Sequence, residues 1–384
     1  MLLRHWPRRH GYGFLQVVKP LKLALPNLVS ALSVFICMAV TTMEARADIE
    51  VKDLKGRSIS LSSPAHRLVI DDGRIILALS FLSDDPVKLV AAWPHDIDRF
   101  GRELYDSYKE KFPMIENLPR STSNAQDLAV ENIIATNPDA VILSVYSHPG
   151  ELQLAQLAEA GIPVIFVDFI TDPLNNTDRS LDVLGKVIGR QQRADRILSL
   201  RKSIKDQIAG TLHSAMAQPM PTIFLEAHAS TQENCCNSPG NSGIGKFLAF
   251  VKAHNLGEVL GSKPFGQVNL EYVVASKPDV YIATGGEYMQ KRGGLRIGPH
   301  YSKEETLASL QELLDRPGFS SLASSATAHG LSQQLFNSPL DILVLELLAK
   351  WAHQDLFRDL DIEASRLELN ALMAVPLADG YWTR

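Results

Sequence analysis

The sequence predicts an α/β fold made of two lobes, in which each lobe contains a parallel sheet and one long helix joins the two. Three observations lead to this prediction. Strand-like segments alternate with helix-like segments, one helix–turn–strand unit occurs twice, and a long helical segment lies between the two copies. Strands that alternate with helices are typical of parallel sheets, and two such blocks indicate two lobes.

The repeated unit is the strongest of these signals. The first copy, VENIIATNPDAVIL, covers residues 130–143, and the second, LEYVVASKPDVYIA, covers residues 270–283 without a gap. Each copy is typical of a short amphipathic helix, a Pro-Asp turn and a buried strand. Proline ends the helix because it has no N–H to donate and its ring clashes with the preceding turn. We therefore interpret the copies as equivalent parts of two Rossmann-like lobes with a ligand cleft between them.

The remaining segments follow the same alternation. The predicted strands are residues 67–70, 87–93, 140–144, 164–168, 222–227 and 280–284. The predicted helices are residues 99–111, 150–160, 243–253, 303–315 and 339–354. This pattern divides the chain into an N-terminal lobe (48–174), a linking helix (175–217) and a C-terminal lobe (218–384).

The linking segment shows apolar residues at helical spacing in two sets. They are Leu181, Leu184, Val187 and Ile188, then Ile197, Leu200, Ile204 and Ile208. The pattern predicts one long helix or two collinear helices. An unbroken helix of this length spans about 60 Å at 1.5 Å per residue. Such a rod would hold the lobes apart and permit little closure.

Residues 1–47 are typical of a cleaved signal peptide. A basic leader precedes a largely apolar stretch from Leu23 to Val40, and Ala45-Arg46-Ala47 supplies an A-x-A cleavage pattern. The alternative is an uncleaved membrane anchor, but Pro26 interrupts the apolar stretch. The sequence thus predicts an exported protein whose mature chain begins at Asp48.

Charge limits the partners of the mature chain. The full chain has 38 Lys and Arg against 43 Asp and Glu, and the leader contains six basic residues and one acidic residue. The mature chain therefore has 32 basic and 42 acidic residues, a net charge of −10. Such a surface repels nucleic acid, which we exclude as a partner.

The sequence carries no motif that predicts an enzyme or a catalytic residue. Residues 240–247, GNSGIGKF, nearly match a phosphate-binding loop, but Phe247 stands where the Mg²⁺-binding Ser or Thr would be. Neither a G-x-S-x-G nor an H-E-x-x-H pattern occurs.

Cys235 and Cys236 are the cysteines that remain after cleavage, and they are adjacent. Neighbouring cysteines cannot join distant segments, so they form either a vicinal disulfide or two free thiols. Their spacing is not that of a zinc site, which needs separated pairs.

The opening segment 49–57 contains a D-x-x-G-R pattern before the first core strand. Together with the doubled Glu…Pro-Asp unit and the central helix, it makes residues 48–384 resemble the periplasmic binding proteins for ferric siderophores, haem and cobalamin. The resemblance implies a periplasmic solute-binding protein that delivers a ferric siderophore or related iron chelate to an ABC permease. It implies a monomer without an intrinsic cofactor, whose ligand is an Fe(III) chelate.

The resemblance also assigns a role to one glutamate in each repeat. In this family a glutamate on the outer surface of each lobe docks onto arginines of the permease, and the matching positions are Glu131 and Glu271. Two carboxylates at a fixed separation suit a two-fold symmetric partner. The alternative is that each glutamate belongs to a solvated helix face.

Ligands of open parallel sheets bind beyond the carboxyl ends of the strands. The residues predicted to bind the ligand there are Arg74, Trp93, Tyr146, His228, Tyr288 and Arg296. Arginine pairs with carboxylate or catecholate oxygens, and aromatic rings give flat contact area, so this set suits a large anionic chelate. Each residue can instead lie in the core or pair locally.

Two other functions stay open. The chain can be a receptor for haem or for a bare divalent metal, although no set of metal ligands can be chosen from the sequence. It can also be an exported enzyme that processes a chelate with Cys235 and Cys236 as a redox pair.

Overall fold

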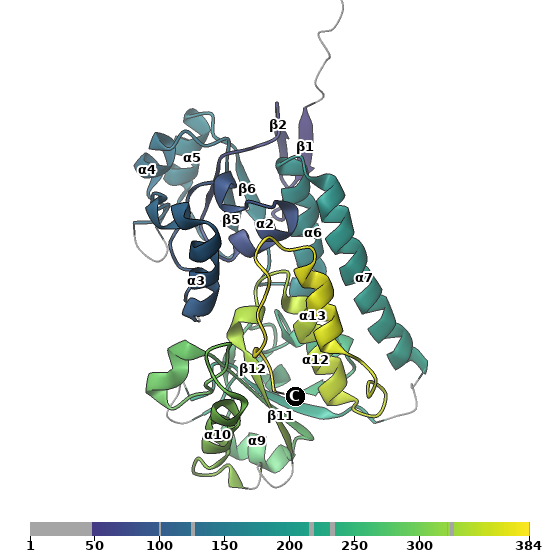
Figure 1. Ribbon diagram of the computed structural model, residues 1–384. Helices are drawn as coiled ribbons and strands as arrows, with labels where there is room; N and C mark the ends of the chain where they lie inside the picture. Colours follow the sequence, from purple (N-terminus) through teal and green to yellow (C-terminus); the bar gives the residue numbers. More distant parts are fainter. Residues whose placement is uncertain are drawn as a thin grey trace, which may run out of the picture. The chain divides into compact units, whose positions relative to one another are not determined.

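The computed structural model describes residues 48–99, 101–123, 127–214, 219–230, 235–320, 322 and 326–383 (Figure 1). The predicted signal peptide, residues 1–47, lies outside the described residues. Residues 48–384 form one structural unit, which contains both lobes. Within the described ranges every helix is too short or too polar to cross a lipid bilayer.

The N-terminal lobe is built on a four-stranded parallel sheet with the order β4-β3-β5-β6. Its strands are β3 (Leu68–Ile70), β4 (Val90–Ala92), β5 (Ala140–Ser144) and β6 (Val164–Val167). Its helices are α2 (Ile75–Leu82), η1 (Val87–Leu89), α3 (Arg102–Lys111), η2 (Pro113–Asn117), α4 (Val130–Ala135), α5 (Glu151–Glu159) and α6 (Pro173–Val187).

The C-terminal lobe has a second four-stranded parallel sheet with the order β12-β11-β7-β9. Its strands are β7 (Thr222–Glu226), β9 (His254–Asn255), β11 (Val280–Gly285) and β12 (Thr327–Ser332). The other elements are β8 (Asn237–Ser238), α8 (Gly245–Phe250), η3 (Leu256–Leu260), β10 (Gly266–Gln267), α9 (Leu270–Ser276), η4 (Glu287–Arg292), α10 (Lys303–Leu314), η5 (Gln333–Leu335), α12 (Asp341–Ala352) and α13 (Ile362–Asn370).

The two sheets have the same topology. When the strands of each lobe are numbered in chain order, both sheets read 2-1-3-4. The repeat supplies the third strand of each, because α4 leads into β5 and α9 leads into β11. The predicted fold class, two α/β lobes with parallel sheets, is therefore confirmed.

The Pro-Asp turn of the repeat fastens its strand to the neighbouring strand in the same way in both lobes. The Asp139 N–H donates to the carbonyl of Arg67 at 2.8 Å, and the Asp139 carboxylate accepts the Arg67 N–H at 2.9 Å. The Asp279 N–H donates to the carbonyl of Thr222 at 2.9 Å, and its carboxylate accepts the Thr222 N–H at 2.7 Å. Each aspartate thus sets the register at the start of a core strand pair.

An antiparallel hairpin of β1 (Ile49–Lys52) and β2 (Ser58–Leu61) precedes the first sheet. Its turn is the D-x-x-G-R pattern. The buried Asp53 carboxylate accepts the backbone N–H of Arg57 at 2.9 Å and pairs with its guanidinium at 2.7 Å. Gly56 supplies the left-handed backbone with φ +79°.

The predicted linking helix, residues 175–217, is wrong as one rod or two collinear helices. The structure has two helices in this region, α6 and α7 (Gln191–Ser214), which lie side by side in Figure 1. They run antiparallel, because Gln191 at the start of α7 reaches Asp182 while Lys205 further along reaches Asp178. The chain reverses at Gly189, whose φ is +64°. Of these two helices, α7, about 36 Å long for its 24 residues, is the one that runs from the N-terminal to the C-terminal lobe.

A buried ion-pair network ties α7 to both lobes. The Arg201 guanidinium, 1% exposed, pairs with Asp178 of α6 at 2.5 Å and with Asp341 of α12 at 2.7 Å. Thr177 donates its hydroxyl to the other Asp341 oxygen at 2.7 Å. A single guanidinium therefore fixes the linking helix to an N-terminal and a C-terminal helix.

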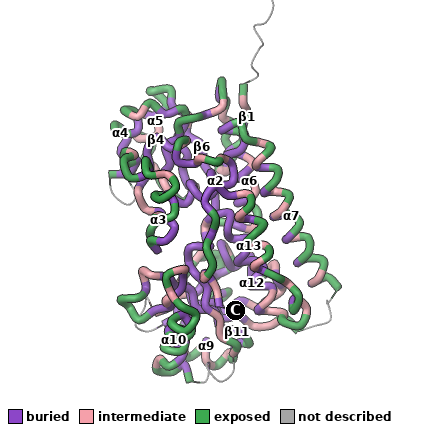
Figure 2. The backbone as a smooth tube through the Cα atoms, in the orientation of Figure 1, coloured by how far each residue is buried: buried purple, intermediate pink, exposed green. Residues whose placement is uncertain are grey.

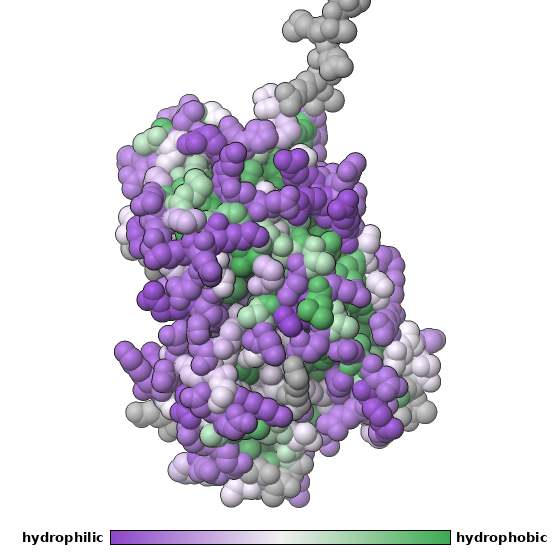
Figure 3. Space-filling view, viewed as in Figure 1, coloured by the Kyte–Doolittle hydropathy of each residue, from purple (hydrophilic) through white to green (hydrophobic). Residues whose placement is uncertain are grey.

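The chain ends along the edge of the second sheet. Trp382 forms an antiparallel bridge with Leu331 of β12, and Thr383 donates its N–H to the carbonyl of Gly330 at 2.9 Å. This tail covers an edge strand that would otherwise present unpaired backbone groups. Buried residues line the sheets and the inner sides of the helices (Figure 2), and polar residues cover most of the face in Figure 3.

Candidate ligand-binding site

The carboxyl ends of the two sheets border one region between the lobes. Gln334, which follows β12, donates its side-chain amide to the carbonyl of Gly101, which follows β4, at 3.1 Å. Glu287, which follows β11, accepts the Arg102 N–H at 3.0 Å. Since ligands of such sheets bind beyond the strand ends, the loops of this region are the candidate site.

The N-terminal side of the site is charged. Directly after β3, Arg74 pairs in a bidentate manner with Asp72, with Nε and Nη2 at 2.9 and 2.5 Å from its oxygens. Asp96 accepts the Gly73 N–H at 2.8 Å and pairs with Arg99. Asp71, Asp72, Arg74, Asp96 and Arg99 form what we call the acid–arginine cluster.

The cluster perturbs its own carboxyl groups in opposite directions. Burial raises the pKa of Asp71 to about 7. The hydrogen bond from the Ser147 hydroxyl opposes this rise, the Asp72 carboxylate adds a smaller rise, and the Ser144 N–H opposes it weakly. Burial also disfavours the Asp72 carboxylate, but the Arg74 guanidinium holds the pKa of Asp72 below its usual value. Asp71 is thus a neutral or half-ionised carboxyl beside an ion pair at neutral pH.

The C-terminal side of the site pairs a neutral imidazole with a phenol, beside the Glu287 carboxylate. His228 follows β7 in a left-handed backbone conformation, φ +51°, and its Nδ1 lies 2.5 Å from the Tyr288 hydroxyl oxygen. Burial lowers the pKa of His228, so the imidazole is neutral at pH 7. Its Nδ1 can then accept a hydrogen bond from the Tyr288 hydroxyl. The His228 N–H donates to the Thr284 hydroxyl at 2.9 Å, which donates to Gln333 at 2.9 Å.

The structure therefore brings together some of the predicted ligand residues. His228 meets Tyr288, and Arg74 lies within the acid–arginine cluster, although it is only 8% exposed and already paired. Tyr146 follows β5 and is 56% exposed, with its ring 6.4 Å from that of His148. Tyr146 is the most accessible aromatic residue of the predicted set.

The other two predicted ligand residues, Trp93 and Arg296, have partners within their own lobes. Trp93 is fully buried, stacks on His95 at 4.5 Å and donates its indole N–H to the carbonyl of Ile115 at 3.3 Å. Arg296 pairs with Glu312 of α10 at 3.0 Å, so its guanidinium is engaged within the C-terminal lobe.

Sequence reasoning missed Asp71, Asp96, Glu287, Gln333 and Gln334. Asp71 directly follows a predicted strand, so the rule that selected Arg74 could also have found it. The glutamines follow β12, a strand that the sequence analysis did not predict.

Glu131 and Glu271 occupy matching places in the two lobes. Both are exposed, and both lie in the first turn of the repeat helices α4 and α9.

The adjacent cysteines form a disulfide in the structure. Both are buried, and the Cys235 carbonyl accepts the Gln267 side-chain N–H at 2.7 Å. The segment that follows pairs with the end of β7, where the Ala227 N–H donates to the carbonyl of Asn237 at 2.7 Å. The disulfide thus lies next to a segment that is hydrogen-bonded to the residue preceding His228.

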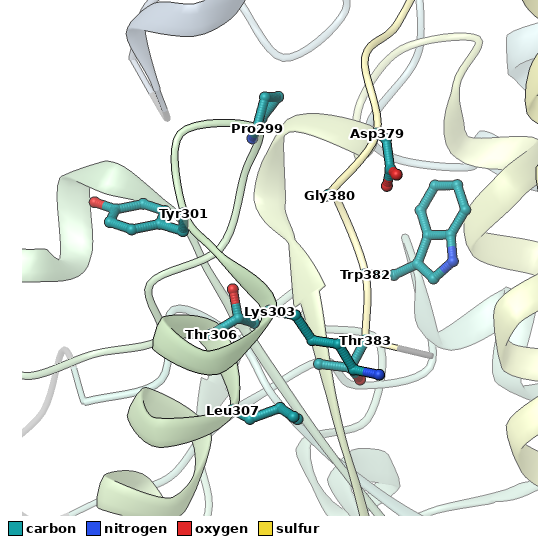
Figure 4. Close-up of a pocket in the computed structure, with 9 residues that line it drawn as sticks. All are labelled: Pro299, Tyr301, Lys303, Thr306, Leu307, Asp379, Gly380, Trp382 and Thr383. Carbon is teal, nitrogen blue, oxygen red and sulfur yellow. The ribbon is translucent and has the colours of Figure 1, made fainter.

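A separate cavity of about 360 Å³ lies within the C-terminal lobe, between α10 and the tail (Figure 4). Its lining residues are Pro299, Tyr301, Lys303, Thr306, Leu307, Asp379, Gly380, Trp382 and Thr383. The rings of Tyr301 and Trp382 extend away from each other, so they do not form an aromatic cage. Among the described residues, no three His, Cys, Asp or Glu side chains converge to hold a metal ion.

Several solved structures share the fold of this chain. A TroA-like periplasmic binding protein, FepB, from Veillonella parvula is 22% identical with a TM-score of 0.77, over 88% of this chain and 99% of that one. Molybdate-bound MolA from Haemophilus influenzae is 16% identical with a TM-score of 0.61, over 86% and 99%. A periplasmic heme binding protein from Pseudomonas aeruginosa is 18% identical with a TM-score of 0.52, over 76% and 93%.

A search of curated proteins found no match. The sequence profile described as periplasmic binding protein, in contrast, matches residues 79–330, which include the strands of the first sheet from β4 onward and most of the second. With the two-lobed fold and the facing strand ends, this match shows that the chain belongs to the periplasmic binding protein family.

Proposed function

We propose that this chain is the extracytoplasmic subunit that carries a ferric siderophore or a related iron chelate to an ABC permease. Periplasmic binding proteins of ABC importers deliver small ligands to a permease. The observation that supports a bulky chelate is the contrast between the two sides of the site. A neutral His228–Tyr288 pair faces the same inter-lobe region as the acid–arginine cluster.

The two sides offer different contacts to one ligand. Tyr288 and the exposed Tyr146 supply flat contact area with polar tips, which suits the body of an organic chelate. Arg99 keeps 46% of its side chain exposed and can donate to chelate oxygens while it stays paired with Asp96. A ligand large enough to touch both sides is held in one orientation.

Glu131 and Glu271 support the permease as partner. Their matching positions on equivalent helices present two exposed carboxylates from two related lobes. Such a pair suits a dimeric permease that presents a cationic site on each half. We propose that the binding protein docks as a monomer through these residues.

The test begins with residues 48–384 purified without added ligand. A broad visible charge-transfer band in the purified chain would support a ferric siderophore as the ligand. A Soret band would instead identify the ligand as haem. The chain is then titrated with ferrioxamine B, ferric enterobactin and free Fe(III) while tryptophan fluorescence is followed. Saturable quenching by one chelate, without quenching by free iron, is expected. Tight binding of free metal and of neither chelate would contradict the proposal.

Matched variants locate the site. His228→Ala and Tyr288→Phe should weaken chelate binding, by about tenfold where a ligand hydrogen bond is lost. Arg296→Ala is the control, because Arg296 pairs with Glu312 within its own lobe. Equal affinity in all three variants would place the ligand elsewhere. Consumption of thiol on addition of the chelate would instead favour the exported enzyme with Cys235 and Cys236.

A further inference from the structure

The N-terminus of α3 is capped by a residue from the other lobe. Gly101 occupies the N-cap position and has no side chain with which to satisfy the first N–H groups of the helix. The Glu287 carboxylate accepts the Arg102 N–H at 3.0 Å, although the two residues are 185 positions apart. A carboxylate at this place also interacts favourably with the helix dipole.

A second contact lies beside the first. Gln334 is 1% exposed, and its side-chain amide donates to the carbonyl of Gly101 at 3.1 Å. The same side chain hydrogen-bonds the Glu103 carboxylate. A buried amide that loses its hydrogen-bond partner is destabilising. Movement of α3 away from Gln334 would break this hydrogen bond, so the contact stabilises the observed position of α3.

Both contacts are one residue away from the neutral side of the candidate site. Glu287 precedes Tyr288, whose hydroxyl meets His228. Gln334 follows Gln333, whose side-chain oxygen accepts a hydrogen bond from the Thr284 hydroxyl. The same hydroxyl accepts the His228 N–H. A ligand that moves His228 or Tyr288 therefore acts on the segments that hold α3.

The contacts lie across the molecule from the linking helix. Figure 1 shows α7 on one side of the two sheets and α3 on the other. We propose that Glu287 and Gln334 form a latch, which fastens α3 to the C-terminal lobe and controls ligand release on the side remote from α7. The proposal rests on the proposed function in that it assigns the ligand to the inter-lobe region.

The first test needs no ligand. Hydrogen exchange of the α3 amides is measured in residues 48–384 and in the variants Glu287→Ala and Glu287→Gln. Loss of the cap in Glu287→Ala should speed exchange in the first turn of α3 about fivefold. Glu287→Gln retains an acceptor oxygen and should restore most of the protection. Glu304→Ala, at an exposed glutamate in the first turn of α10, is the control.

Equal α3 exchange in wild type and Glu287→Ala would overturn the latch. Gln334→Ala is the second variant, and its thermal unfolding is recorded so that a folding defect is recognised. Unchanged α3 exchange in a folded Gln334→Ala chain would remove Gln334 from the latch.

The second test measures ligand release by stopped-flow fluorescence with ferrioxamine B and ferric enterobactin. The dissociation rate of the bound chelate should rise about fivefold in Glu287→Ala, with a smaller change in the association rate. Faster α3 exchange with an unchanged dissociation rate would overturn the role in release. Binding of neither chelate by the wild type would count against the proposed function, and the exchange test would still decide the α3 contact.

Discussion

The two lobes share one scaffold but differ in the residues that the scaffold presents. Both sheets have the strand order 2-1-3-4, and in both an aspartate of the Pro-Asp turn binds the start of the neighbouring strand. At the opposite ends of the strands the N-terminal lobe presents carboxylates and guanidinium groups, and the C-terminal lobe presents a neutral imidazole and a phenol. The Pro-Asp contacts that the lobes share therefore concern folding, and the strand-end residues in which the lobes differ lie at the candidate ligand site.

Burial acts on both sides of the site and reduces charge on each. It raises the pKa of Asp71 to about 7 and lowers the pKa of His228, because the charged form is disfavoured away from water in both cases. The ion pairs Asp72–Arg74 and Asp96–Arg99 keep the rest of the acid–arginine cluster balanced. The site is thus polar without a large net charge.

The contact between the lobes should show the largest effect on stability. Replacement of Arg201 by Met would leave Asp178 and Asp341 without their buried cation, and Asp341 is 1% exposed. We expect a loss of about 3–5 kcal/mol in the free energy of unfolding, measured by denaturant titration. Lys202→Ala is the control, because its pair with Asp206 is exposed and should change stability by less than about 1 kcal/mol. A small loss in Arg201→Met would mean that the lobes do not depend on this network.

The opposed pKa shifts predict opposed pH dependences for the two sides. Asp71 holds its proton more tightly in the folded chain, so its contribution to stability falls as pH rises from about 4 to about 7, by up to about 1.4 kcal/mol per pH unit. His228 has a depressed pKa, so its contribution is present above about pH 6.5 and is lost as pH falls through the folded pKa.

Unfolding measured between pH 4 and 8 checks both signs. The difference between wild type and Asp71→Asn should fall with rising pH, and the difference between wild type and His228→Gln should rise. Asn and Gln do not titrate in this pH range, and each keeps a polar group of similar size at its position. Slopes of the same sign for the two differences would show that the two sides titrate alike.

The parts predicted from the sequence are those in which local pattern and fold agree. The central strands β5 and β11 were predicted because their apolar runs follow a helix stopped by proline. The strand β12 was missed because its sequence, TAHGLS, is largely small and polar, and its outer edge is covered by a tail far away in sequence. Tertiary pairing, rather than local preference, makes it a strand.

The differences between prediction and structure share one cause. A sequence pattern identifies an element but does not give the direction of the next segment or of a side chain. Helical spacing identifies a helix but gives no sign that the chain reverses at Gly189, so it predicts one long helix or two collinear helices where the structure has α6 and α7 side by side. A position after a strand likewise does not reveal whether a side chain turns inward. Trp93 turns into the core and Tyr146 outward, although both follow strands of the same sheet.

The smallest effect we expect tests the equivalence of the two lobes. Asp139→Ala and Asp279→Ala each remove carboxylate bonds to the start of the neighbouring strand, at exposed positions. Each should lower the free energy of unfolding by about 1 kcal/mol, as expected for an exposed charge-assisted hydrogen bond to backbone. Asp315→Ala, at the exposed end of α10, should cost less, because its partner is a side chain one helical turn away. Equal losses at Asp139 and Asp279 would show that the repeat has the same energetic role in both lobes. A large loss in one lobe alone would mean that the shared geometry has acquired different roles, so that the lobes differ in their folding as well as in their strand-end chemistry.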